Sequence, residues 1–385
     1  MLINSDLKLR NFVEECSKSP YMCIDTEFLR EKTYYAKLCL LQICIEGSVA
    51  IIDPFEISDL TVLREPLENP QIVKIFHACS QDVEIILNEI GCVPSPIFDT
   101  QIAASLLGKT QQASYSTLVQ QYCNVQLAKK DSFTDWSRRP LSESQIEYAA
   151  DDVVYLPKIY QEMISLLESK KRLSWLDSAF EEIENPEKYK VDPYARFRKL
   201  KRVNQLTQVQ LAAAREFAAW REIKAQKLNI PRKWIVSDEQ IVEACRREPK
   251  SLDELYMVRG MRDRLKPDEA REVLTAIKKG LACPEDQLPS IHNKNKNEAN
   301  VDIVVDLLNA IVRLRARENK IAVQTLASSA ELMKLARGHY EDCEILKGWR
   351  YQIVGKELLE LLDGKFSLSI DDGNLKISYN NKIEE

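Results

Sequence analysis

The spacing of apolar residues changes near Pro186, and this change limits the folds that are open to the chain. Before Pro186, apolar runs of strand length alternate with amphipathic stretches of helical length. After it, nearly every apolar stretch repeats at the helical spacing. The chain has 385 residues, which is too many for one ordinary domain. We therefore expect an α/β domain followed by smaller all-α domains.

The first 185 residues predict a mixed sheet flanked by helices. Short turns separate the first three apolar runs, which favours an antiparallel meander. We expect strands at residues 21–24, 36–45, 49–52 and 72–76, and helices at residues 6–18 and 80–90. A capping-box sequence that begins at Ser142 predicts one long helix running to about Lys170.

The rest of the chain predicts helices separated by linkers. We expect helices at residues 208–227, 238–247, 251–256 and 267–279, a further helical stretch at 301–363, and a terminal hairpin around residues 371–373. The stretch with Asn and Lys in alternation, near residue 295, is the best linker candidate. The expected domains are residues 1–185, a basic linker 186–207, residues 208–285, a polar linker 286–300, and residues 301–385.

Positive charge is concentrated in one segment of an acidic chain. Between Lys188 and Lys233 there are thirteen Lys and Arg residues against three acidic ones, although the net charge of the whole chain is −5. An acidic body with one basic segment suits a protein that binds a polyanion. A solvated helix face explains the same pattern about equally well.

Several functional classes are disfavoured. The sequence contains no Gly-x-Gly-x-x-Gly or Walker-type loop, so we expect no nucleotide cofactor. It has ten cysteines but no Cys-x-x-Cys pair and only three histidines, which makes a structural zinc site improbable. No apolar run reaches membrane-spanning length, and the N-terminus lacks the pattern of a signal peptide. We expect a cytoplasmic monomer that does not bind membranes.

Four carboxylates and one tyrosine could together form a metal site. Asp25 and Glu27 are two residues apart at a strand end, so both side chains project to one face. Such hard oxygen ligands suit Mg²⁺ or Mn²⁺. Asp82 begins a helix, where the dipole alone also favours an acid. Tyr148 and Asp152 share a helix face, although a surface contact would look the same.

Longer phrases give this set a context. They are residues 24–28, 38–43, 77–82, 98–101, 134–141 and 148–156. In this order they resemble the tyrosine-bearing branch of the DEDD exonuclease superfamily, and the chain is similar to the bacterial ribonuclease D family. The resemblance implies a ribonuclease H-like α/β exonuclease domain. It also implies two divalent ions, Mg²⁺ or Mn²⁺, bound by four acids: Asp25, Glu27, Asp82 and Asp152.

Tyr148 would orient or help to activate the attacking water. A tyrosine with an ordinary pKa near 10 is a poor base, so we favour positioning by a hydrogen bond. The product would be a 5′-nucleoside monophosphate. His77, in the same motif as Asp82, is a candidate for substrate binding, or equally a satisfied buried histidine.

Other candidates for RNA binding lie close to these motifs. Arg138 and Arg139 suit phosphate, and Trp136 could stack a base. A structural tryptophan beside solvent-facing arginines is an equally good interpretation. Phe28 and Leu29 follow the first acids and could wedge the terminal base, although core packing is the more ordinary explanation for Leu29.

A third group of motifs lies at residues 215–222, 231–236 and 252–255. Through these motifs, residues 208–285 resemble the HRDC module, a small helical bundle that often binds nucleic acid as an accessory domain. Residues 301–385 look like a second such module, on weaker grounds. Basic residues at the leading edge of the first module are expected to neutralise phosphates and make binding salt-sensitive. They include Arg196, Arg198, Lys199, Lys201 and Arg202.

The sequence therefore predicts a metal-dependent 3′→5′ exoribonuclease that trims tRNA precursors and other small structured RNAs. The tRNA assignment follows from the resemblance alone. A 3′→5′ DNA exonuclease is the main alternative, because the same carboxylates serve both sugars. A non-catalytic RNA-binding protein is a third possibility, which the presence of all four acids and the tyrosine disfavours.

Overall fold

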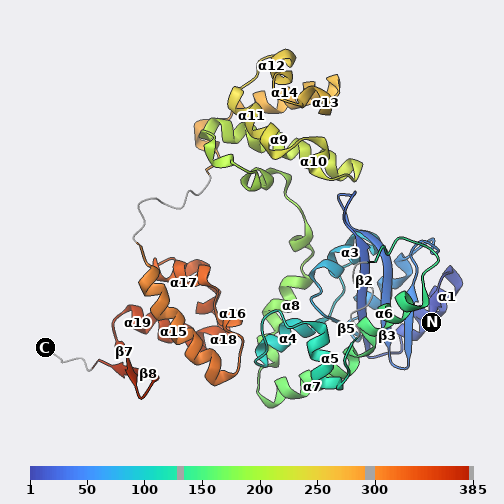
Figure 1. Ribbon diagram of the computed structural model, residues 1–385, viewed down its shortest axis with the longest axis vertical. Coiled ribbons are helices and arrows are strands. Elements are labelled where there is room, and N and C mark those ends of the chain that lie inside the picture. The colour runs from blue at the N-terminus through green and yellow to red at the C-terminus, as the bar shows by residue number, and fades with distance from the viewer. Residues whose placement is uncertain (128–133, 291–299, 381–385) are drawn as a thin grey trace. The chain divides into compact units, whose positions relative to one another are not determined.

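The computed structural model describes residues 1–127, 134–290 and 300–380, and it divides into two compact units (Figure 1). The first unit contains residues 1–26, 40–185 and 299–385. The second contains residues 27–39 and 186–298. Most of the polar linker expected at 286–300 lies outside the described residues, because 291–299 are not among them. None of the helices in the described ranges is both long enough and apolar enough to cross a bilayer.

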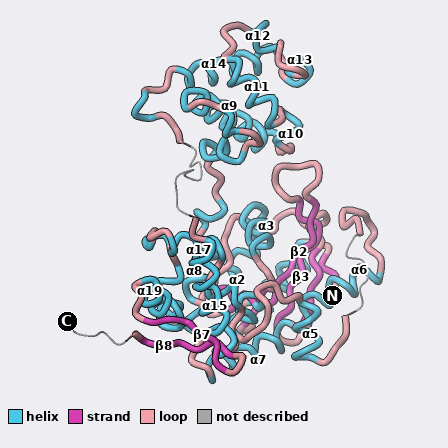
Figure 2. The backbone as a smooth tube through the Cα atoms, turned by 60° about the vertical axis from the view of Figure 1, so that its left-hand side comes forward, coloured by secondary structure: helices cyan, strands magenta, loops and turns pink. Residues whose placement is uncertain are grey.

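A six-stranded mixed sheet is formed by the N-terminal part of the chain (Figure 2). Its order is β1-β4-β3-β2-β5-β6. The strands are β1 (Leu2–Ile3), β2 (Tyr21–Leu29), β3 (Lys37–Ile45), β4 (Ser48–Ile52), β5 (Val73–Phe76) and β6 (Ile97–Asp99). The pair β3 and β4 is antiparallel, whereas β1 pairs with β4, β2 with β5, and β5 with β6 in parallel.

The predicted run of three neighbouring strands is confirmed, since β2, β3 and β4 are adjacent in the sheet. The strands β1 and β6 were not predicted. They contain two and three residues, respectively, which is too short for an alternating pattern to be visible. Strand β3 is buried at every position after its first residue, because it lies inside the sheet.

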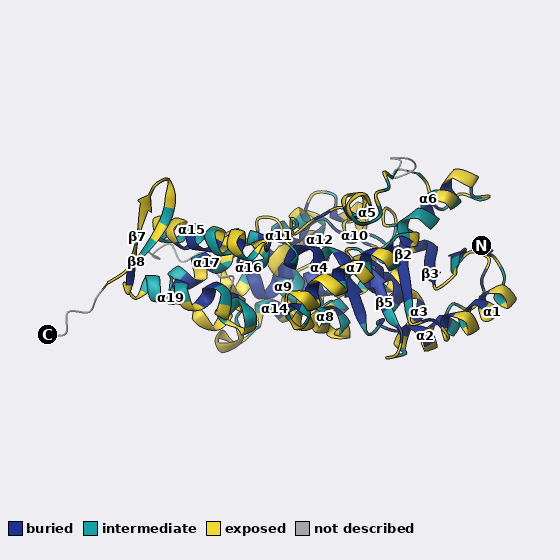
Figure 3. Cartoon of the chain, turned by 90° about the horizontal axis from the view of Figure 1, so that it is seen from below, coloured by how far each residue is buried: buried dark blue, intermediate teal, exposed yellow. Residues whose placement is uncertain are grey.

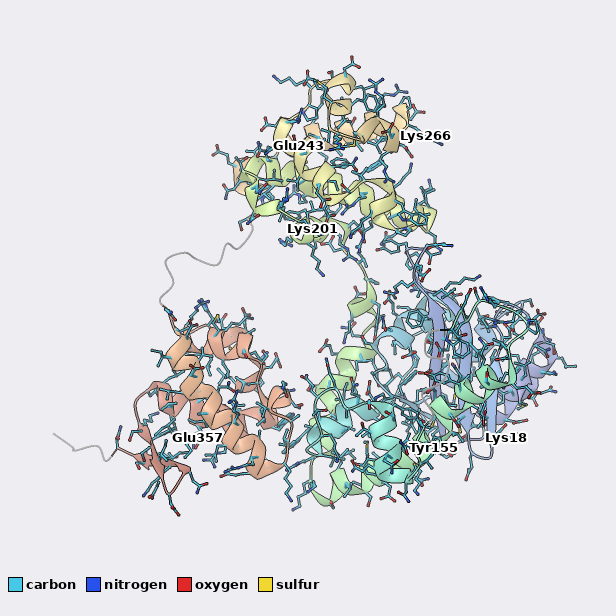
Figure 4. The ribbon with its side chains drawn as sticks, viewed as in Figure 1. Lys18, Tyr155, Lys201, Glu243, Lys266 and Glu357 are labelled. Atoms are coloured by element: carbon cyan, nitrogen blue, oxygen red, sulfur yellow. The ribbon has the colours of Figure 1, made fainter. Side chains whose placement is uncertain are left out.

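Helices surround the sheet. They are α1 (Asp6–Cys16), α2 (Arg64–Glu68), α3 (Ser80–Ile90), α4 (Thr100–Leu106), α5 (Tyr115–Cys123), α6 (Glu143–Val154), α7 (Leu156–Ser169) and α8 (Asp177–Glu184). The prediction of one long helix after Ser142 is wrong, because helix α6 ends at Val154 and helix α7 begins at Leu156. Tyr155, labelled in Figure 4, lies between the two helices. Pro157 lies in the first turn of α7, where its missing N–H is tolerated, and it cannot continue the hydrogen bonding of α6.

The C-terminal helices belong to the first unit. They are α15 (Asp302–Asn319), α16 (Val323–Leu326), α17 (Ser329–Ala336), α18 (Gly348–Arg350) and α19 (Lys356–Leu362). Trp349 stacks on Trp175 with ring centroids 4.5 Å apart, and Arg172 Nη2 donates to the Asn319 carbonyl at 2.6 Å. The predicted hairpin is confirmed as β7 (Phe366–Asp371) and β8 (Asn374–Tyr379).

The second unit is helical apart from residues 27–39. Its helices are α9 (Gln208–Leu228), α10 (Arg232–Ile235), α11 (Asp238–Arg247), α12 (Leu252–Tyr256), α13 (Met261–Arg264) and α14 (Pro267–Leu281). Figure 3 shows buried faces on α9 and α14. A Cβ on Gly280 would lie 2.3 Å from the Cα of Ala213, so only glycine permits this close approach. Helices α10 and α13 were not predicted, since four residues show no periodicity.

Candidate active site

Three of the predicted acids meet at strand β2, which continues past Asp25 and Glu27 to Leu29. One carboxylate oxygen from each of Asp25, Glu27 and Asp152 lies within 4.8 Å of the other two. The alternation of the strand explains the pairing of Asp25 with Glu27, because residues two apart share a face. Helix α6 supplies Asp152 from a distant part of the sequence. All three side chains are partly exposed, so the cluster is accessible to an ion or a substrate.

Asp82, the fourth predicted acid, does not belong to this group of three. It is 7% exposed in the first turn of α3, and its Oδ1 accepts a hydrogen bond of 2.5 Å from Thr26 Oγ1. Thr26 is the residue between Asp25 and Glu27, so the fourth acid contacts the same short segment of β2. Burial raises the pKa of Asp82 to about 7, although the hydrogen bond from Thr26 opposes this rise.

Electrostatics at the site favour a cation. Burial, and next the charge of Asp151, raise the pKa of Asp152 to about 7. Carboxylates this close together repel one another unless a proton or a positive charge lies between them. A divalent ion satisfies that requirement and prefers such oxygen ligands, so the donor set fits Mg²⁺ or Mn²⁺.

Helix α6 is held in place at both ends. At its start, Ser142 and Gln145 form the predicted capping box. Near its end, the Tyr115 hydroxyl of α5 donates to the Asp151 carbonyl at 2.9 Å. Tyr148 lies one turn before Asp152, and its ring packs against Trp136 with centroids 5.9 Å apart. The backbone that carries Asp152 is therefore fixed by a neighbouring helix.

The loop before α3 is organised by Asp99. This side chain is 2% exposed, and it accepts hydrogen bonds from the backbone N–H groups of Ala78 and Cys79 and from two N–H groups of α4. Ala78 has a φ of 62°, a strained value for a residue with a Cβ. His77 Nδ1 lies 2.9 Å from Thr100 Oγ1, and burial lowers the pKa of this histidine.

The arginine and tryptophan candidates differ in their surroundings. Arg139 forms a two-pronged ion pair with Asp53, which is 4% exposed, and also donates to the Trp136 carbonyl at 2.8 Å. Arg138 is 83% exposed and lies 3.4 Å from Asp135. Trp136 itself is 4% exposed, so its indole is packed inside the protein. Of these residues, Arg138 is the most available to a substrate.

The remaining candidates fall into two groups. Phe28 and Leu29 are partly exposed at the end of β2, directly after Glu27. The basic residues lie in the second unit: the Arg198 guanidinium is 5.1 Å from the Phe197 ring centre, Lys199 lines a small pocket, and Arg202 lines a wider groove. Figure 4 labels Lys201, which is exposed.

Two residues with positioning roles were not predicted from the sequence. Tyr115 contacts a carbonyl 36 residues away, and Asp99 contacts backbone groups about 20 residues away. Neither contact follows from a periodic spacing. Two signals pointed to Asp99: it lies in the family-like phrase 98–101, and it precedes a helix, where an N-cap acid is favoured.

Two family models match parts of the chain. Residues 2–168 match a family model described as 3′-5′ exonuclease, and residues 210–277 match the HRDC domain. The chain is 36% identical to the ribonuclease D of Sphingobium indicum, over 98% of both chains. It is 36% identical to the ribonuclease D of Zymomonas mobilis, over 98% of this chain and 97% of the relative.

The structure is similar to the crystal structure of Escherichia coli RNase D, described as an exoribonuclease involved in structured RNA processing. The TM-score is 0.80 at 31% identity, covering 94% of this chain and 98% of that one. This likeness agrees with the predicted fold class, an α/β exonuclease domain followed by a helical region that includes an HRDC domain.

Proposed function

The chain belongs to the ribonuclease D family of 3′→5′ exoribonucleases, and from this premise we propose that it trims the 3′ ends of tRNA precursors and other small structured RNAs. The observation that carries the proposal is the convergence of Asp152 with Asp25 and Glu27 of strand β2. Each cycle would release one 5′-nucleoside monophosphate. We place the activity in the cytoplasm of a bacterial cell and expect a monomer.

Enzymes with this exonuclease domain depend on divalent metal, and the acidic cluster suits such an ion. We propose two ions, Mg²⁺ or Mn²⁺, held by Asp25, Glu27 and Asp152 together with Asp82. When bound, they would supply Lewis-acid stabilisation of the charge that develops as water attacks the phosphodiester. The hydrogen bond from Thr26, the residue between Asp25 and Glu27, orients the Asp82 carboxylate.

Tyr148 is proposed to position the attacking water. It lies on the same helix face as Asp152, one turn earlier. Its ring is held by the buried Trp136. A phenol can donate and accept hydrogen bonds, whereas its ordinary pKa is far above neutral, so orientation suits it better than proton abstraction.

Substrate contacts near the cluster are assigned by exposure. We propose that Phe28 and Leu29 contact the terminal base, since they are partly exposed beside Glu27. Arg138, which projects into solvent, is proposed to contact a backbone phosphate. His77 and Arg139 are proposed to contribute indirectly, because both are engaged with neighbouring side chains.

A time course with two polymers tests the proposal. The protein is incubated with Mg²⁺ or Mn²⁺ and a 5′-labelled tRNA that carries a 3′ extension. A parallel reaction contains a DNA oligomer with the same sequence as that extension. We expect a metal-dependent ladder that shortens the RNA from its 3′ end. Asp152→Asn should abolish it, and Glu147→Gln, an exposed acid on the same helix, should not. Faster shortening of the DNA, or binding of RNA without cleavage, would contradict the proposal.

A further inference from the structure

The second unit contains a small pocket lined almost entirely by charged residues. Its volume is about 110 Å³, which is room for a few water molecules or one tetrahedral anion, and too small for a nucleoside. The residues that line it are Arg196, Lys199, Leu200, Arg221, Glu222, Arg232, Lys233 and Asp238. Five of them are cations and two are acids, so the lining has a net charge of +3.

Both acids of this basic pocket are already paired. Glu222 is fully buried and contacts Arg196 Nε at 3.0 Å and Arg232 Nη1 at 3.3 Å. Asp238 accepts a hydrogen bond of 2.8 Å from Arg221 Nη1. The internal pairs therefore neutralise the acids and leave a surplus of positive charge.

The surplus includes two exposed lysines. Lys199 and Lys233 line the pocket, and among the described residues neither forms an ion pair. Two ammonium groups beside one small cavity repel each other and gain most from an anion placed between them.

The pocket also has a buried donor without an acceptor. Arg221 is 5% exposed, and among the described residues its Nε finds no hydrogen-bond partner. Its Nη1 is occupied by the Val236 carbonyl and by Asp238. A buried guanidinium N–H without a partner is costly, and burial accordingly lowers the pKa of Arg221. An anion in the pocket is the kind of ligand that this donor lacks.

We propose that the basic pocket binds one backbone phosphodiester of the RNA, and that it is a different site from the carboxylate cluster. The proposed function enters this inference only where it identifies the bound polyanion as RNA. Trp234 follows Lys233 directly and is 51% exposed, although an indole is usually buried. An exposed aromatic ring next to a phosphate site is typical of single-strand binding, so Trp234 would stack the neighbouring base.

Binding can be measured without hydrolysis. The full-length protein is titrated in EDTA against a fluorescent single-stranded RNA of 20 nucleotides, at several salt concentrations and by anisotropy. The test variant is Lys199→Gln with Lys233→Gln. The matched control is Lys227→Gln with Lys250→Gln, two exposed lysines of the same unit that do not line the pocket.

Loss of one phosphate contact should reduce the magnitude of the slope of log affinity against log salt concentration (the salt slope) by about 0.7. RNA binding should weaken roughly fourfold at 0.15 M salt. The control variant should bind as the wild type does. Inorganic phosphate, added at constant ionic strength, should compete with RNA for the wild type and should not compete for the test variant. Equal RNA affinity and salt slope in the test and control variants would overturn the proposal. So would phosphate competition that persists in the test variant.

A second readout separates this inference from the proposed function. Cleavage of the 3′-extended tRNA is measured beside binding, for the wild type and for the test variant. If neither protein cleaves any RNA but the binding difference remains, the proposed function fails and the pocket stands. If both cleave normally and bind alike, the pocket fails alone.

Discussion

Tyr115→Phe tests whether the position of helix α6 controls the chemistry. The substitution removes one hydroxyl and keeps the buried ring. The lost hydrogen bond, 2.9 Å long, joins Tyr115 to the carbonyl of Asp151, the neighbour of Asp152. One buried hydrogen bond of this kind contributes about 1 kcal/mol to stability, which in a unit of this size is a fall in Tm of about 2–4 °C.

If most of this energy holds Asp152 in its working position, kcat should fall about fivefold to tenfold, with KM little changed. Single-turnover cleavage of the labelled RNA measures this directly. Tyr160→Phe is the matched control: its ring packs edge-on against Phe98 at 4.9 Å, and its hydroxyl makes no hydrogen bond with the described residues. A kcat for Tyr115→Phe equal to that of the control would refute the reasoning, even with the expected loss of stability.

Three further predictions concern metal affinity and packing. Thr26→Val removes the donor to Asp82 at nearly constant volume, so Mn²⁺ binding, followed by electron paramagnetic resonance, should weaken about tenfold; unchanged affinity would contradict a positioning role. The pKa values of Asp82 and Asp152 are raised to about 7, so protons compete with the metal ion below that pH. Mg²⁺ should therefore bind roughly tenfold to a hundredfold more tightly at pH 8 than at pH 6. Calorimetry that shows no pH dependence of Mg²⁺ affinity would refute this. Trp349→Ala removes the partner of the Trp175 stack and should lower the free energy of unfolding by about 2–4 kcal/mol, whereas Trp349→Phe, which keeps an aromatic ring, should lower it by less than about 1.5 kcal/mol; equal losses in urea denaturation would argue against stacking.

The strands and helices that the sequence predicted are those with a long periodic pattern. The helix expected at 80–90 is found at Ser80–Ile90, because Gly91, with a φ of 84°, ends it. Prediction failed where the apolar pattern covered too few residues, or where a local backbone constraint overrode it. Strand β1 has two residues, and the proline at the start of α7 outweighed an apolar spacing that continues through Tyr155.

Local spacing predicted which site residues share a strand or helix face, but it did not predict the contacts between distant segments. The pairing of Asp25 with Glu27 follows from the period of a strand, and the placing of Tyr148 with Asp152 follows from the period of a helix. The approach of Asp152 to the strand depends on tertiary packing, which only the family resemblance supplied. The contacts of Tyr115 and Asp99 join distant segments and left no trace in local spacing.

The buried ion pairs were the least predictable feature. Arg139 was expected to face a phosphate, as one of two equal interpretations, and it instead pairs with Asp53. Glu222 lies within the most basic stretch of the chain, where a sequence shows excess charge but not which charges are neutralised internally.

The central claim is that Asp25 and its neighbours hold the metal at which RNA is cleaved. The most direct test measures Mn²⁺ binding and RNA cleavage together for Asp25→Asn and for Glu147→Gln, an exposed acid outside the cluster. Removing a charged ligand should cost about 4 kcal/mol of transition-state stabilisation, so cleavage by Asp25→Asn should fall about a thousandfold, with weakened Mn²⁺ binding and unchanged RNA affinity. The control should match the wild type. Near-normal cleavage by Asp25→Asn, or normal Mn²⁺ binding, would contradict the account.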